Sequence, residues 1–318
     1  MAIKGIDWNL DGYNSEAHFF LSGAFESFDF IREFLKMTKA CPWILKDNAF
    51  IDSVFGSPTC IWNGGRTISN VYYDKNQLQT IHNTYSELGV KVRFIFTNPL
   101  LNDYDLYDRY GNLLMSIFQD LSPEVVVNSP LLEDYLRDKY PSLSFISSTT
   151  KRLRCNEDQL KEFDHDYKYV CLDYDYNYDN DFLDNIPMKD RNKVEILLNS
   201  VCPKGCKVRV LHQNFSAKQQ LEYGDDDVRD ESEPFFKECP LSKRRINIPP
   251  EKQGYTREYL RGTNYIFPQD LNNYLDKGFC HFKIQGRELP PSLLVGKLLP
   301  YLIRPEFYPM AMSVISNG

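Results

Sequence analysis

The stretch EVVVNSPLLEDYLRDKYPSLSFIS, residues 124–147, decides the fold. Residues 124–128 and 143–147 are short, nearly continuous apolar runs, which are typical of strands covered on both faces. Between them, residues 130–140 carry apolar side chains at roughly helical spacing. A strand, a helix and a second strand in this order predict two parallel strands joined by a helix.

The same unit recurs along the chain. Strand-like runs occupy residues 17–23, 49–56, 90–98, 124–128, 143–147, 169–175, 193–199 and 279–285. Eight strand and helix units that close on themselves form a (β/α)8 TIM-like barrel. We therefore predict one α/β barrel domain over residues 1–318, with a doubly wound open sheet as the structural alternative.

The regular spacing is interrupted once, between the seventh and eighth runs. Residues 200–262 form a long insertion, which contains cysteines, the acidic run DDDVRDESE (residues 225–233) and the basic run SKRR. Long connections in compact domains are usually functional or disordered. The composition of the acidic run predicts a solvated face or a flexible loop without chemistry of its own.

Composition limits the location and the partners of the chain. The formal charge of -7 and the pI near 5.4 argue against binding of nucleic acid through overall charge, so an RNA partner would need a local site. No run of 18 apolar residues and no signal-peptide pattern is present, so we expect a cytoplasmic protein without a membrane span. There the eight cysteines should stay reduced, as buried thiols or metal ligands.

Cysteines follow the seventh predicted strand at the barrel mouth. Cys202 and Cys206 flank a Pro-Lys-Gly turn that can point both thiols at one metal, and Cys239 lies in the same insertion. Cys60 follows the second strand on the same face and is the first candidate for a fourth ligand. Cys280 is the second candidate, since it begins the eighth strand, nearer the opposite face. Spacing alone permits a 4Fe-4S cluster, zinc or metal-free buried thiols.

Polar residues close the predicted strands at the face where barrel enzymes keep their chemistry. They are Asn98, Asn128, Ser147, Asp173, Asp175 and Asn199. Asp173 and Asp175 alternate along one strand, so their carboxylates could bind a cation or transfer a proton. Each of these residues could equally cap the helix that follows its strand.

Three basic residues are candidates for contact with an anionic substrate. Arg209 and His212 follow Cys206 by three and six residues, so a helix would place both on one face. Arg287 lies at the mouth of the eighth strand, where a guanidinium suits bidentate binding of carboxylate or phosphate. Tyrosines in YDLYDRY (residues 104–110) and LDYDYNYD (residues 172–179) offer stacking surfaces for a base or an aromatic ring.

The segment YIFPQDLNNYLDKGFCHFKIQGR, residues 265–287, resembles the signature of the collagenase-like peptidase family U32. In that family a Y-x-x-x-x-D-L segment leads through a helix to a glycine and then to K-I-E-G-R. Gln285 stands here where the family usually has glutamate, which puts in doubt any role that needs the carboxylate. The resemblance extends weakly through residues 52–56 to Gly64-Gly65-Arg66, and it covers most of residues 17–304 as a fold.

The resemblance implies a barrel that carries an oxygen-sensitive 4Fe-4S cluster on four cysteines, here Cys202, Cys206, Cys239 and Cys60. It also implies hydroxylation of an RNA base or of the ubiquinone ring without molecular oxygen, sometimes shared between two related subunits. We therefore predict an iron-sulfur enzyme that modifies an RNA base or a small aromatic substrate.

Two other functions stay open at this point. One is a metal-free or zinc-dependent barrel lyase or hydrolase that uses Asp173 and Asp175, including a U32-type peptidase. The sequence has no His-Glu-x-x-His zinc motif and no Gly-x-Ser-x-Gly nucleophile turn to support proteolysis. The other is a non-catalytic partner subunit with a structural cluster.

Overall fold

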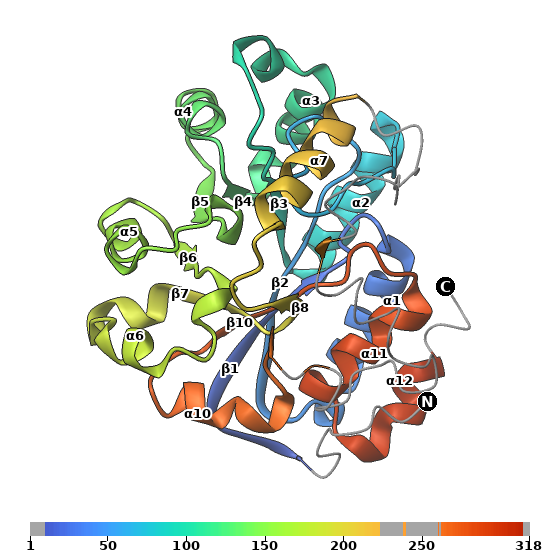
Figure 1. Ribbon diagram of the computed structural model, residues 1–318. Coiled ribbons are helices and arrows are strands. Elements are labelled where there is room, and N and C mark those ends of the chain that lie inside the picture. The colour runs from blue at the N-terminus through green and yellow to red at the C-terminus, as the bar shows by residue number, and fades with distance from the viewer. Residues whose placement is uncertain (1–9, 223–237, 240–259, 261, 314–318) are drawn as a thin grey trace.

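Eight parallel strands form a closed barrel in the order β1-β10-β7-β6-β5-β4-β3-β2 (Figure 1). The computed structural model describes residues 10–222, 238–239, 260 and 262–313. The barrel strands are β1 (Gly12–Ser22), β2 (Asp47–Gly56), β3 (Lys91–Phe96), β4 (Glu124–Val127), β5 (Ser144–Ser147), β6 (Tyr169–Cys171), β7 (Val194–Leu197) and β10 (His281–Ile284). The predicted (β/α)8 barrel is confirmed, because each predicted run overlaps one of these strands and the sheet closes on itself.

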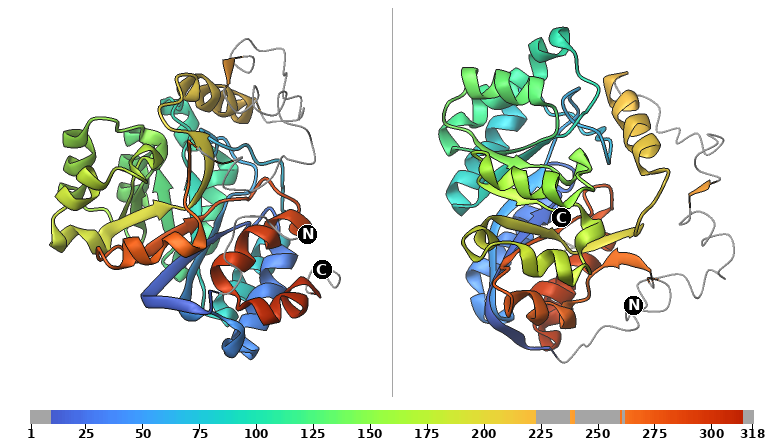
Figure 2. Two further views of the ribbon diagram at one scale, coloured as in Figure 1. Left: turned by 60° about the horizontal axis from the view of Figure 1, so that its bottom comes forward. Right: turned by 60° about the vertical axis from the view of Figure 1, so that its left-hand side comes forward.

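Helices surround the barrel on its outside (Figures 1 and 2). They are α1 (Phe28–Ala40), α2 (Lys75–Leu88), α3 (Arg109–Phe118), α4 (Pro130–Lys139), α5 (Asn156–Lys161), α6 (Asn180–Asn185), α10 (Asn272–Leu275), α11 (Pro291–Leu302) and α12 (Tyr308–Ser313). Residues 124–147 form the strand, helix and strand that their sequence predicts. Within the described residues, no helix is long and apolar enough to cross a membrane.

The barrel strands are buried on both faces, which explains their continuous apolar runs. Phe20, Phe55, Ile95, Val126 and Ile146 form a separate cluster of buried side chains, to which five different barrel strands contribute. The alternate residues of these strands pack in the larger core, together with the helices. Central strands therefore have no solvent-facing side that would require polar residues.

Charged side chains are also buried among the barrel strands. Arg93 of β3 pairs with Glu124 and Glu195, and Lys283 lies 3.1 Å from Glu195. The guanidinium carbon of Arg93 lies 3.5 Å from the ring centroid of Phe20. Although burial opposes ionisation, Lys283 and Arg93 lower the pKa of Glu195 to about 2. The four charges thus compensate one another in the barrel.

The connection between β7 and β10 adds structure at the carboxyl-terminal end of the barrel. Strands β8 (Asn199–Pro203) and β9 (Thr263–Tyr265) form an antiparallel pair, and α7 (Arg209–Leu221) follows β8 (Figure 2). The acidic run and the SKRR run of the predicted insertion lie outside the described residues.

Candidate active site at the carboxyl-terminal rim

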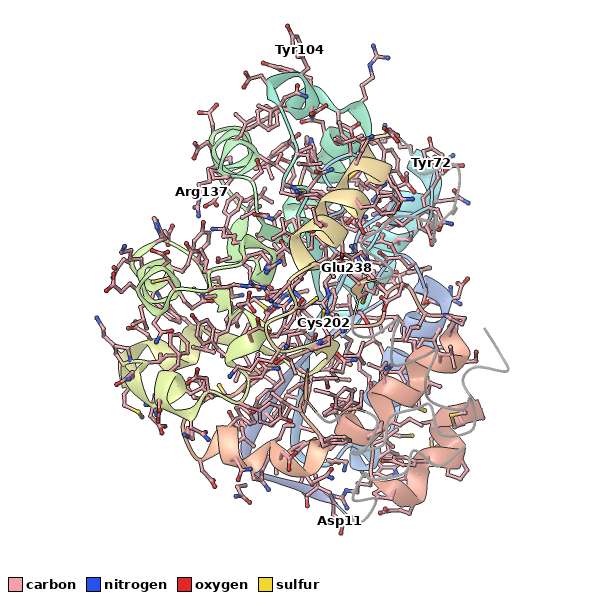
Figure 3. All side chains as sticks on the ribbon, in the orientation of Figure 1. Asp11, Tyr72, Tyr104, Arg137, Cys202 and Glu238 are labelled. Atoms are coloured by element: carbon pink, nitrogen blue, oxygen red, sulfur yellow. The ribbon has the colours of Figure 1, made fainter. Side chains whose placement is uncertain are left out.

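Three cysteines lie together in the connection after β7. Cys202 is in β8, and Gly205 then turns the chain in the left-handed conformation, with φ of 67°. The thiols of Cys202 and Cys206 hydrogen-bond to each other. Cys239 packs against the small apolar cluster of Cys206 and Val208. Figure 3 labels Cys202 near the start of α7, the helix that follows its strand.

The two hydrogen-bonded thiols differ in acidity. The hydrogen bond from Cys206, together with the positive charges of Arg66 and Arg209, lowers the pKa of Cys202 to about 6 against the effect of burial. The same hydrogen bond, burial and the nearby negative charge raise the pKa of Cys206. The pair is therefore a thiolate at Cys202 that accepts a hydrogen bond from the thiol of Cys206.

Arg209 joins the two predicted carboxylates to this loop. Its side chain is 2% exposed, and it donates to Asp173 at 3.1 Å and to Asp175 at 2.5 Å. It also donates to the carbonyl of Pro203 at 3.1 Å and lies 4.1 Å from the ring centroid of Tyr174. Both aspartates therefore face a guanidinium and are not an open pair for a cation.

Asp175 also fixes the cysteine loop. It accepts a hydrogen bond from the backbone N-H of Gly205 at 3.1 Å and from the Asn264 amide at 2.9 Å. The same amide of Asn264 donates to the carbonyl of Cys202 at 3.1 Å. Asp173 caps the short helix Tyr174–Tyr176, as the capping alternative predicts, and burial raises its pKa.

Arg66 is a residue of the rim that the sequence analysis did not select. It follows Gly64 and Gly65, whose φ angles are 122° and 77°, and a Cβ on Gly65 would lie 2.3 Å from the carbonyl oxygen of Thr97. The two glycines thus let the loop pass against the end of β3. The Arg66 guanidinium then lies 4.7 Å from the ring centroid of Tyr174. The Gly-Gly dipeptide after a strand is the signal that could have found it.

Arg152 is a second such residue. It has a left-handed backbone, with φ of 63°, which is uncommon for a non-glycine residue and is often found at functional sites. Its Nε lies 3.8 Å from Oδ2 of Asp173. Nearby, Arg154 donates to the carbonyl of Cys206 at 3.0 Å. Burial and the charges of Arg154 and Arg209 lower the pKa of Arg152.

Arg287 is buried in a neighbouring part of the rim. It donates to Oδ1 of Asn63 at 2.9 Å and to the carbonyl of Thr67 at 2.6 Å, and it pairs with Glu26 at 3.5 Å. Only 6% of its side chain is exposed. Arg287 thus anchors the loop that carries Arg66.

Three other predicted residues lie apart from the cysteine pair. Cys60 is in the expected loop after β2, but it is fully buried in the main core beside Ser57, and burial raises its pKa to about 12. Cys280 directly precedes β10, at the opposite end of the barrel. His212 is exposed, whereas Arg209 on the same helix is buried, so the structure separates the two.

The remaining polar strand ends bond to neighbouring loops. The Asn98 amide donates to backbone carbonyls of the β2–α2 loop and of α7, and Asn128 and Ser147 donate to side chains of the loops beyond β5. Asn199 exchanges backbone and side-chain hydrogen bonds with Gln285. The Gln285 amide donates to the carbonyl of Asn199, which a glutamate carboxylate could not do.

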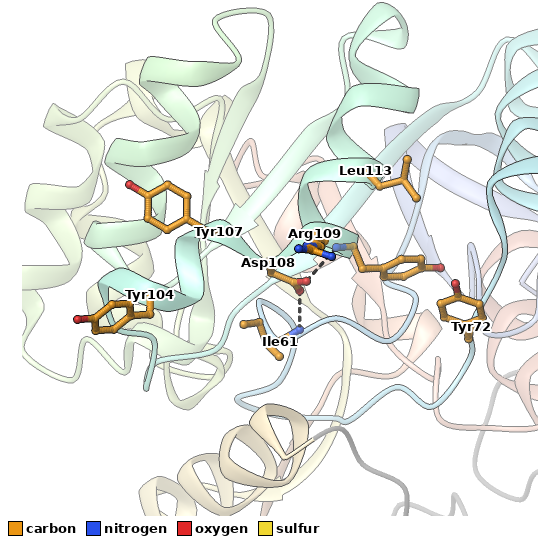
Figure 4. Close-up of a pocket in the computed structure, with 8 residues that line it drawn as sticks. Ile61, Tyr72, Tyr104, Tyr107, Asp108, Arg109 and Leu113 are labelled. Carbon is orange, nitrogen blue, oxygen red and sulfur yellow. Dashed lines mark hydrogen bonds between the residues drawn. The ribbon is translucent and has the colours of Figure 1, made fainter.

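An aromatic pocket lies between the loops that follow β2 and β3 (Figure 4). Its volume is about 580 Å³, and its lining residues are Ile61, Tyr72, Tyr104, Tyr107, Asp108, Arg109, Tyr110 and Leu113. Tyr72, Tyr104 and Tyr107 are largely exposed, and Tyr72 stacks on Tyr110 at 5.0 Å. The YDLYDRY segment thus forms an exposed aromatic surface on the rim.

In the described part of the chain, no group of three or more His, Cys, Asp or Glu side chains has the arrangement of a metal site.

No protein-family model matches the sequence, and no curated protein matches it. Among solved structures, the chain is similar to one described as that of the U32 peptidase Mk0906. The two share 15% identity over 86% of this chain and 94% of that chain, with a TM-score of 0.48.

Proposed function

We propose that this chain is a U32-type barrel enzyme in which Cys202, Cys206 and Cys239 hold an iron-sulfur cluster. Its reaction would be an oxygen-independent hydroxylation, or a related redox modification, of an RNA base or a small aromatic substrate. The observation that carries the proposal is the gathering of three thiols from two segments of the chain at the rim. Barrel enzymes keep their chemistry at this rim, and thiolates are the protein ligands of iron-sulfur clusters.

The three thiols are of the chemical kind that binds such a group, but in this structure they do not have the arrangement of a metal site. Metal ligands must be deprotonated, and the lowered pKa of Cys202 supplies one thiolate near neutral pH. Cys60 does not fit as a fourth ligand, because its thiol is buried in the main core. Three cysteines would leave one position for a ligand that is not a cysteine. When bound, the cluster would supply electron transfer or Lewis-acid chemistry.

The surrounding residues of the chain would bind and orient the substrate. Arg66 and Arg209 both lie against the ring of Tyr174, beside Cys202, so their charges stabilise negative charge at this point. The exposed tyrosines of the aromatic pocket offer faces on which a base or ring can stack. These features support a substrate that combines an aromatic ring with negative charge.

The metal content of the protein tests the proposal. Protein purified without oxygen should be brown and contain about four irons per chain with matching acid-labile sulfide. Cys202→Ser and Cys239→Ser should lose the iron, whereas Cys41→Ser, at the end of α1 before β2, should keep it. Iron-free protein with bound zinc would favour a zinc-dependent barrel enzyme instead. Metal-free protein that stays folded would overturn the metal centre.

A dithiol function is the second candidate, because Cys202 and Cys206 are already in hydrogen-bond contact. Oxidation of the thiolate and thiol would form one Cys202–Cys206 disulfide and release one proton and two electrons. These electrons, with that proton and one from solvent, would reduce a disulfide such as oxidised glutathione to two thiols. This function predicts that iron-free protein loses two titratable thiols on oxidation and regains both on reduction. Mass spectrometry should then find the two residues in one cross-linked peptide.

A further inference from the structure

We propose that the rim binds an oxyanion of the substrate, a carboxylate or a phosphate, between the guanidinium groups of Arg66, Arg152 and Arg209. This inference deepens the proposed function by naming the chemical class that the site recognises. It rests on the proposal that this rim is the working site, but it does not depend on a bound metal.

The first argument is the density of positive charge around Tyr174. The guanidinium carbons of Arg66 and Arg209 lie 4.7 Å and 4.1 Å from the centroid of its ring. Arg152 is close enough to Arg209 and Arg154 for their charges to oppose its own. Arg152 and Arg209 face the carboxylates of Asp173 and Asp175, while Arg66 lies on the Tyr174 ring and Arg154 on the carbonyl of Cys206. Clustered cations of this kind are stabilised by a bound anion.

The second argument is a surplus of hydrogen-bond donors. In the part of the chain that the structure describes, five buried nitrogen atoms of this group donate no hydrogen bond. They are Arg66 Nη1, Arg152 Nε, Arg209 Nε, Gln159 Nε2 and Gln213 Nε2. Oδ2 of Asp173 also lacks a hydrogen bond and lies 3.8 Å from Arg152 Nε, so, within the described residues, four of these donors have no carboxylate oxygen against them.

The two glutamines belong to this group by their own contacts. Oε1 of Gln159 accepts from the backbone N-H of Asp173 at 3.0 Å, and Oε1 of Gln213 accepts from Arg152 at 3.5 Å. These contacts place the carbonyl oxygens of both glutamines against Asp173 and Arg152, and their amide nitrogens are buried without a hydrogen bond. The donors come from elements far apart in the sequence, as expected for a binding site built by the fold.

The donor surplus determines the kind of ligand. A buried donor without an acceptor costs about 1–3 kcal/mol, so several together favour a ligand that is rich in acceptors. A cation would meet more donors than acceptors, and an apolar group would leave the donors unsatisfied. A carboxylate or phosphate supplies two or more oxygens and matches the planar N-H groups of arginine. The left-handed backbone of Arg152 is a further cost that a binding role explains.

Calorimetric titration tests the inference. The reduced, full-length protein is titrated with inorganic phosphate and, separately, with malonate at constant ionic strength. We expect saturable binding of at least one anion at one site per chain. Arg66→Gln should weaken this binding about tenfold or more, the loss of one charge-assisted contact. Arg66 is the best position to change, because its hydrogen bond to Ser200 is long, at 3.3 Å. Arg32→Gln, on α1 outside the barrel, should bind as the wild type does.

Each outcome decides a separate question. Tighter binding of phosphate indicates a nucleotide or RNA backbone, and tighter binding of malonate indicates a carboxylate substrate. The inference fails if neither anion binds saturably, or if Arg66→Gln and Arg152→Gln both bind as tightly as the wild type while keeping its thermal unfolding temperature. Iron content tests the cluster independently of anion binding. Iron-free protein that binds phosphate would support this inference and contradict the proposed cluster. Iron-loaded protein that binds neither anion would support the cluster and contradict this inference.

Discussion

Alkylation of Cys202 measures the electrostatics of the rim. The hydrogen bond from Cys206 and the charges of Arg66 and Arg209 lower the pKa of Cys202 from 9.0 to about 6, although burial opposes them. At pH 7 this makes about nine-tenths of the residue thiolate, compared with about one-hundredth at the ordinary value. A less basic thiolate is also a weaker nucleophile, by about twentyfold for this change in pKa.

These two effects give opposite results at the ends of the pH range. Compared with the same cysteine in urea-unfolded protein, the thiolate population dominates at pH 5 and predicts alkylation about 40-fold faster in the folded protein. At pH 9 the lower nucleophilicity dominates and predicts alkylation about tenfold slower. Because the thiol is half-buried, limited access slows its alkylation in the folded protein by the same factor at pH 5 and at pH 9. The pH at which the rate is half-maximal does not depend on this factor and is therefore the quantity to measure.

The assay is pH-dependent labelling of metal-free protein with iodoacetamide, followed by mass spectrometry of the Cys202 peptide. Half-maximal labelling should fall near pH 6. Arg66→Gln should move it to higher pH, because one of the charges that stabilise the thiolate is gone, whereas Arg109→Gln should not. A midpoint equal to that of the unfolded protein would refute the electrostatic reasoning.

Three further variants test the structure around the site and in the core. Arg209→Met removes the cation that hydrogen-bonds to Asp173 and Asp175 and leaves Asp173 the 3.8 Å contact with Arg152, so it should lower the free energy of unfolding in urea by about 3–5 kcal/mol. Exposed Lys36→Met should change it by less than about 1 kcal/mol, and equal effects would contradict the buried network. Gly205→Ala should lower the free energy of unfolding by about 1–2 kcal/mol, because its φ is positive but its Cβ would have no neighbour within 4 Å. Gly65→Ala should lower it further, because a Cβ at this similar φ would lie 2.3 Å from a backbone oxygen. Burial lowers the pKa of Lys297 from 10.5 to about 7 in the folded protein. Between these two pH values Lys297 is protonated in the unfolded chain and neutral in the folded one. The free energy of unfolding of the wild type should therefore rise with pH over this range. In urea titrations, Lys297→Met should remove this rise and should stabilise the protein more at pH 6 than at pH 9. An effect of the same size at both pH values would contradict the lowered pKa of Lys297.

The barrel was predictable because two-sided burial leaves a local signal. Six of the ten positions in residues 124–128 and 143–147 are apolar, and the structure buries eight of the ten. The antiparallel pair of β8 and β9 leaves no such signal. Its strands are short and partly polar, and they pair across about 60 residues of intervening chain, so their partner is set by tertiary structure.

The site could be predicted only where residues cluster along the chain. Cys202, Cys206 and Arg209 belong to one segment and lie together, and Asp173 and Asp175 end a strand that a barrel brings to the same rim. A lone arginine in a loop carries no spacing signal, and Arg66 and Arg152 were therefore missed. Arg287 was predicted to bind a carboxylate or phosphate, and in the structure its N-H groups donate to Asn63 and to the carbonyl of Thr67.

The contacts of Asp175 make the thiol pair and the arginines one electrostatic unit. This carboxylate holds Arg209 on one side and the turn of the cysteine loop on the other, through Gly205 and Asn264. The position of the thiolate and the position of the guanidinium are thus set by the same group, in the short helix Tyr174–Tyr176 that follows β6. Anion binding and thiolate formation compete for the same positive charges, so any substrate that binds here must change the acidity of Cys202.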